Sequence, residues 1–132
     1  RCWNGNFLPS TGPDGDGEMP EIYYKRMKQI SNWMKHSAES VFDVKGIAYP
    51  EQSNVPVTKR GNKWYVHVHW LHDYPVEIKT KYTPLSAKLL RTGDKIEFAE
   101  NEGEIGFTIP VQLRTNLNDV VEIEWPEEGI PE

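Results

Sequence analysis

The hydrophobic residues of this 132-residue chain recur with the period of an α-helix in one N-terminal segment. In most of the remaining chain they alternate with a period of two. Between residues 20 and 36, apolar side chains recur at the spacing of one buried helix face: Tyr23, Met27, Ile30 and Met34. From about Val55 onward the period is two, which is typical of strands buried on one side. The pattern therefore predicts one helix followed by an all-β region.

Six short segments have the composition of strands, and turn-forming residues separate them: 63–70, 76–81, 87–90, 95–99, 105–110 and 120–125. Short strands at this spacing predict an antiparallel β-sandwich rather than a parallel sheet. Alternation within the segments assigns one set of side chains to the core. The predicted core consists of Trp64, Val66, Val68, Trp70, Ile96, Phe98, Phe107, Ile109, Val121 and Ile123.

Charge divides the chain near residue 44. Residues 1–45 hold six basic and six acidic residues, whereas residues 46–132 hold nine basic and fourteen acidic ones. The net charge of −5 argues against nucleic acid as a partner, and no apolar run approaches the roughly 18 residues of a membrane helix. One loop and one helix cannot form a core alone, so we expect residues 1–44 to be the end of a larger domain and residues 45–132 to be a separate β-domain.

Several motifs are similar to one enzyme family. The stretches 4–8 (Asn-Gly-Asn-Phe-Leu), 12–17 (Gly-Pro-Asp-Gly-Asp-Gly) and 30–35 (Ile-Ser-Asn-Trp-Met-Lys) resemble the end of the catalytic barrel of α-L-fucosidases, glycoside hydrolase family 29. Residues 58–68 (Thr-Lys-Arg-Gly-Asn-Lys-Trp-Tyr-Val-His-Val) resemble the first clear strand of that family's C-terminal β-sandwich. The resemblance keeps its order and spacing over nearly the whole chain.

The resemblance implies a mainly β chain: an antiparallel β-sandwich preceded by the last strand, loop and helix of a (β/α)₈-type barrel. It implies a parent enzyme that removes α-L-fucose from glycans by a retaining mechanism, without a cofactor. The two carboxylates that such a mechanism needs belong to earlier barrel strands in the family, so we expect no catalytic residue here and an inactive isolated segment. It further implies a secreted or periplasmic protein, or a lysosomal one in a eukaryote. The expected partners are a fucosylated glycan and the rest of the barrel, or further copies of the chain.

Two residues are candidates for contact with substrate. Ser10 stands where the family has an Asn at the end of the barrel strand, and active sites of barrels are built at that end. Trp3 flanks the same strand, and its ring could stack on a sugar. Trp64 and Trp70 could also stack on sugars, but alternation assigns both to the core.

Two groups of side chains could bind metal, and for each the simpler interpretation is favoured. Asp14, Asp16 and Glu18 have only the start of a calcium-loop spacing, and a turn-forming acidic loop is favoured. His67 and His69 share one strand face, and His72 and Asp73 follow closely, but a packed or solvated face is favoured over zinc or copper. We therefore expect no metal site.

Two further interpretations concern the whole chain and its cysteine. Cys2 is a lone thiol, for which a buried or incidental role is expected. A non-catalytic carbohydrate-binding β-sandwich is the alternative to a fucosidase fragment, and it predicts exposed aromatic residues on one sheet face. The alternation instead places most aromatic residues on core faces.

Overall fold

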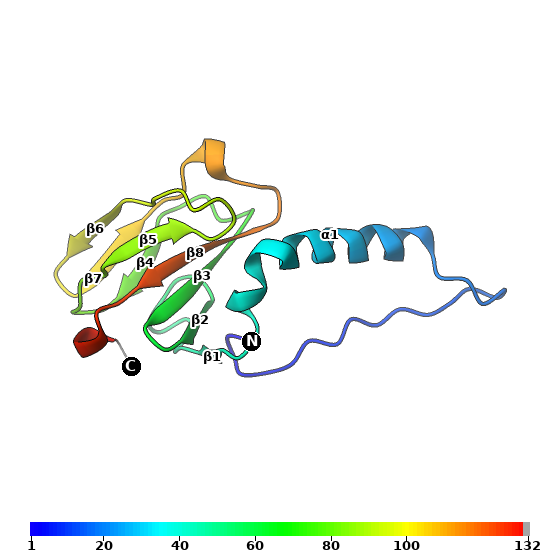
Figure 1. Ribbon diagram of the computed structural model, residues 1–132, viewed down its shortest axis with the longest axis horizontal. Helices are drawn as coiled ribbons and strands as arrows, with labels where there is room; N and C mark the ends of the chain where they lie inside the picture. Colours follow the sequence, from blue (N-terminus) through cyan, green and yellow to red (C-terminus); the bar gives the residue numbers. More distant parts are fainter. Residues whose placement is uncertain (131–132) are drawn as a thin grey trace.

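The computed structural model describes residues 1–130, and within them one α-helix precedes eight short strands (Figure 1). The helix, α1, spans Glu21–Ser37 and directly follows Pro20, close to the predicted range. The strands are β1 (Lys45–Gly46), β2 (Val57–Arg60), β3 (Lys63–His69), β4 (Val76–Lys79), β5 (Ser86–Leu89), β6 (Phe98–Asn101), β7 (Glu104–Phe107) and β8 (Asn118–Glu124). Short 3-10 turns lie at Ala38–Ser40, Val111–Leu113 and Glu127–Gly129.

The strands form two antiparallel sheets, as the sequence predicted. One sheet has the order β1-β2-β3-β8-β5, and the other has the order β4-β7-β6. The long central pair is β3 with β8, running from Lys63 opposite Glu124 to His69 opposite Asn118. The chain is therefore mainly β, with its helix outside the sandwich.

The core lies between the two sheets. Of the ten predicted core residues, all but Trp70 and Phe98 are buried. The ring of Trp64 meets that of Trp125 edge to face, with 5.1 Å between their centroids, and both side chains are fully buried. Burial of such large apolar rings supplies much of the driving force for folding.

The prediction for Trp70 is wrong, because the strand ends one residue earlier. β3 ends at His69, and the backbone N–H of His72 donates to the His69 carbonyl at 2.8 Å. This turn breaks the alternation, and Trp70 is 51% exposed. Phe98 is half-buried, because it packs at the margin of the core on β6.

Some strands differ from the prediction as well. β1 and β2 were not predicted, and the segment predicted to begin at residue 95 begins at Phe98. The expected barrel strand before the helix is absent: no strand is assigned between residues 1 and 20. A strand exists only where a neighbour completes its backbone hydrogen bonds, and this segment meets β1 through the side chain of Asn4 rather than through a backbone ladder.

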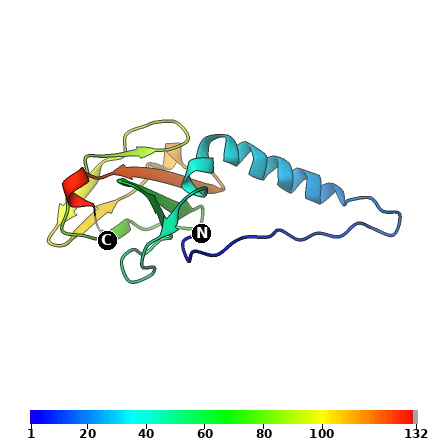
Figure 2. The same ribbon diagram turned by 60° about the horizontal axis from the view of Figure 1, so that its bottom comes forward.

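Only the C-terminal end of α1 packs on the sandwich. Trp33 lies on the outer face of the five-stranded sheet, in a cluster with Val44, Tyr65 and Val120. Figures 1 and 2 show α1 and residues 1–20 projecting together from one side of the sandwich, and Ile30 remains 43% exposed. In the described part of the chain, no helix has the length and apolar character to cross a membrane.

Amide hydrogen exchange is expected to become faster from the C-terminal end of α1 toward its N-terminal end. An isolated helix of this length is marginal in water, and only the end near Trp33 is stabilised by the sheet. Exchange measured residue by residue in the 132-residue chain should show amides near Trp33 protected more than those near Tyr24. Uniform strong protection along the helix would contradict this arrangement.

Candidate functional site

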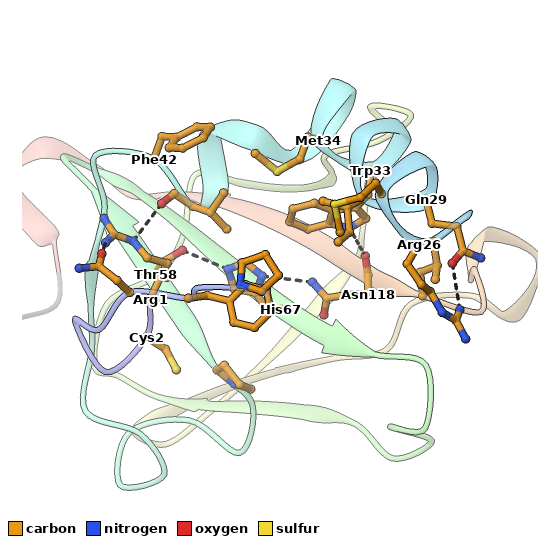
Figure 3. Close-up of a pocket in the computed structure, with 18 of the residues that line it drawn as sticks. Arg1, Cys2, Arg26, Gln29, Trp33, Met34, Phe42, Thr58, His67 and Asn118 are labelled. Carbon is orange, nitrogen blue, oxygen red and sulfur yellow. Dashed lines mark hydrogen bonds between the residues drawn. The ribbon is translucent and has the colours of Figure 1, made fainter. Parts of the chain in front are cut away.

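A groove of about 1110 Å³ separates the projecting elements from the sandwich. The N-terminal segment, α1 and the outer face of the five-stranded sheet contribute its residues (Figure 3). Most side chains of its walls are apolar: Phe7, Met27, Ile30, Trp33, Met34 and Phe42. An open groove of this composition is suited to receive apolar side chains or an amphipathic ligand.

The floor of the groove is polar, and its hydrogen bonds determine the tautomer of His67. The Thr58 hydroxyl donates to the Ser40 carbonyl at 2.6 Å, so its oxygen accepts from His67 Nε2 at 3.1 Å. His67 Nδ1 then carries no proton and accepts from Asn118 Nδ2 at 3.2 Å. Both ring nitrogens are therefore occupied by protein partners (Figure 3).

Burial of the ring lowers the pKa of His67 from 6.5 to about 4. The direction agrees with the hydrogen bonds, because the neutral tautomer already satisfies both nitrogens. A protonated ring would bring an N–H toward the amide group of Asn118, which donates in the present arrangement. His67 is thus a neutral structural link at neutral pH.

The same floor connects the helix and the N-terminal segment to the sheet. Trp33 Nε1 donates to the Asn118 carbonyl at 2.7 Å. The backbone N–H of Gly46 donates to Asn4 Oδ1 at 2.9 Å, and a β-carbon at Gly46 would overlap the carbonyl of Cys2. Glycine at position 46 therefore allows the segment to lie directly on β1.

The groove lacks the chemistry for glycoside hydrolysis. Retaining hydrolysis uses two carboxyl groups about 5–5.5 Å apart, on either side of the bond to be broken. Among the described residues that line the groove, Asp43 is the one carboxylic acid. The arrangement fits a packing surface rather than a catalytic centre.

The two predicted substrate residues do not line this groove. Trp3 is 73% exposed, and its ring centroid lies 5.8 Å from that of Tyr49. Ser10 is exposed in the extended segment before α1. The structure does not bring these two side chains together with the groove, and their contact with substrate stays a prediction.

The acidic loop forms a turn through its first carboxylate. Asp14 Oδ1 accepts from the backbone N–H groups of Asp16 at 3.0 Å and Glu18 at 2.9 Å. His69, the other half of the histidine pair, is exposed, whereas His67 lies in the groove. Within residues 1–130, no cluster of three or more His, Cys, Asp or Glu side chains could hold a metal ion.

Sequence reasoning missed the partners of His67. Thr58 and Asn118 lie 9 and 51 residues from it along the chain and reach it through the pairing of β2, β3 and β8. Alternation assigned His67 to the face opposite the core, and no sequence signal indicated which neighbours would meet it there.

Comparison with known proteins relates the chain to one group of enzymes. No family model matches the chain. Tissue α-L-fucosidase of Rattus norvegicus is 24% identical over 108 residues, which are 79% of this chain and 22% of the rat protein. The chain thus spans less than a quarter of that relative.

Solved structures of bacterial enzymes have the same fold. α-L-Fucosidase isoenzyme 1 of Paenibacillus thiaminolyticus matches 95% of this chain with a TM-score of 0.78 and 24% identity, over 32% of its own length. A family 29 α-L-fucosidase of Bacteroides thetaiotaomicron matches 86% of this chain with a TM-score of 0.69 and 22% identity, over 27% of its own length. The predicted resemblance is confirmed: this chain is similar in sequence and fold to about a third of an α-L-fucosidase, consistent with a C-terminal part of one.

Proposed function

We propose that this chain is the C-terminal portion of an α-L-fucosidase-like glycoside hydrolase, which removes α-L-fucose from glycans. The observation that supports this most is the similarity over most of the chain to α-L-fucosidases, in sequence and in fold. The chain spans a third or less of these proteins, so the activity is proposed for the whole protein.

The proposed role of this segment is structural. The two carboxylates buried within residues 1–130 have basic partners that suit a role in stability. Glu122 lies 3.2 Å from the ammonium of Lys63 and 3.1 Å from that of Lys88. Asp119 lies 3.5 Å from Arg114 and accepts from Thr115. The catalytic carboxylate pair is therefore proposed to lie in the remaining part of the enzyme.

The open groove supports the same proposal. Its apolar walls include the exposed face of α1, where Ile30 is 43% exposed. Such a face is stable in water only when another element covers it. The remaining barrel of the parent enzyme is the proposed cover, and Trp3 and Ser10 are proposed to face its substrate.

The mechanism is proposed to retain the anomeric configuration. The α-L-fucosidase of Bacteroides thetaiotaomicron has been trapped as a covalent intermediate, which is the species expected for a retaining glycosidase. A covalent intermediate requires two displacements at the anomeric carbon, so the first sugar released has the configuration of the substrate. This property belongs to the relative and is extended here by analogy.

The complete parent protein is expected to hydrolyse 4-nitrophenyl α-L-fucoside, and the 132-residue chain alone is expected not to. Proton NMR during hydrolysis should show α-L-fucose forming before the β anomer. Ser10→Ala in the parent should change KM by a few-fold, as one neutral hydrogen bond would, and leave turnover intact. Turnover by the isolated chain, or a parent without fucosidase activity, would contradict the proposal. Release of the β anomer first would contradict the mechanism alone.

A further inference from the structure

The loop between β3 and β4 exposes three large apolar side chains within five residues. Trp70 is 51% exposed, Leu71 63% and Tyr74 55%. Trp70 lies beside His69, and the ring of Tyr74 lies on that of His72 with 3.9 Å between centroids. This concentration of exposed apolar side chains requires an explanation, because isolated exposed apolar residues are common and clusters are not.

The backbone beneath these rings is held in one conformation by Arg114. Its Nη2 donates to the His69 carbonyl at 2.9 Å, and its Nη1 donates to the His72 carbonyl at 2.8 Å. Arg114 is itself paired with the buried carboxylate of Asp119. The loop is therefore ordered before any ligand arrives, which lowers the entropic cost of binding.

Polar groups in the loop complement the rings. The backbone N–H of Leu71 donates to His69 Nδ1 at 3.3 Å, so the ring N–H that can be donated is at Nε2. The carboxylate of the exposed Asp73 can accept hydrogen bonds. Aromatic faces with one donor and one acceptor nearby match a pyranose, which has an apolar face and hydroxyl groups at its edge.

We propose that this loop, residues 69–75, is a binding surface for a fucosylated oligosaccharide. Trp70 and Tyr74 stack on sugar rings, and His69 and Asp73 bond to hydroxyl groups. The choice of a fucosylated ligand rests on the proposed function, whereas the recognition of a pyranose rests on the loop itself.

The experiment is a titration of the ¹⁵N-labelled 132-residue chain with a fucosylated trisaccharide, followed by NMR. Shifts are expected at the Trp70 indole N–H and at the backbone amides of residues 69–74. Trp70→Ala should weaken binding about fivefold or more, as expected for the loss of one aromatic stacking contact, while Trp70→Phe should retain most of it. Leu85→Ala is the matched control, because Leu85 is a 64% exposed apolar residue outside the loop.

Three outcomes would overturn this proposal: no shifts in the loop, equal effects of Trp70→Ala and Leu85→Ala, or equal shifts with glycerol, which has hydroxyl groups and no ring. The titration involves no catalytic step, so it stands apart from the fucosidase assay. If the parent enzyme had no fucosidase activity, the proposed function would be contradicted, but the binding result would still hold. If the trisaccharide did not bind the loop while the parent enzyme kept its fucosidase activity, the proposed binding surface would be contradicted and the proposed function would stand.

Discussion

Replacing Trp64 with alanine is expected to lower the free energy of unfolding by about 3–5 kcal/mol, the range for deleting a large buried ring. The side chain is fully buried between the sheets and packs edge to face on Trp125. Its indole N–H has no hydrogen-bond partner among the described residues, so the loss is one of packing. Chemical denaturation of the 132-residue chain, followed by far-ultraviolet circular dichroism, measures the change.

Trp3→Ala is the matched control for this substitution. It removes the same side chain from a site where the ring is 73% exposed, and surface substitutions usually change stability by less than about 0.5 kcal/mol. Equal effects of the two substitutions would contradict the assignment of Trp64 to the core. A loss of stability in Trp64→Ala alone would support it.

The sequence predicted the sandwich core well because alternation is a local property of a strand. Trp64, Val66 and Val68 face the core as the period of two requires. The same rule failed at Trp70, where the turn that closes on His69 ends the strand. Alternation identifies the faces of a strand but does not say where a strand stops, because the end depends on hydrogen bonds made elsewhere in the chain.

The candidate site could be predicted only in part for a related reason. The apolar stripe of the helix, with its Trp33, was visible as a pattern of 3.6 residues, but within the described chain only its C-terminal end packs on the sheet. The polar floor depends on the order of strands in the sheet. β8 pairs with β3, although 48 residues separate the end of β3 from the start of β8. No pattern within either strand specifies that pairing, so the contact of His67 with Asn118 could not be anticipated.

The stability of the chain is expected to fall as the pH is lowered from 6.5 toward 4, and His67 should account for a large part of that fall. Burial lowers its pKa to about 4 in the fold, against 6.5 in an unfolded chain. Between these values the unfolded chain binds the additional proton, so acidification favours unfolding. The difference corresponds to roughly 3 kcal/mol, fully present as stability above about pH 6.5 and lost progressively below it.

His67→Gln removes the titrating group while keeping a donor for Thr58 and an acceptor for Asn118. Urea denaturation at a series of pH values between 4 and 7 should show a shallower pH dependence of the free energy of unfolding in this variant.

Burial also lowers the pKa of His36 and His72, and their contributions remain in both proteins and cancel in the comparison. His69→Gln is the control for replacing a histidine with glutamine, since that ring is exposed two residues along the same strand. Equal slopes for wild type and His67→Gln would mean that folding does not lower the pKa of His67, which would contradict a buried neutral imidazole between Thr58 and Asn118.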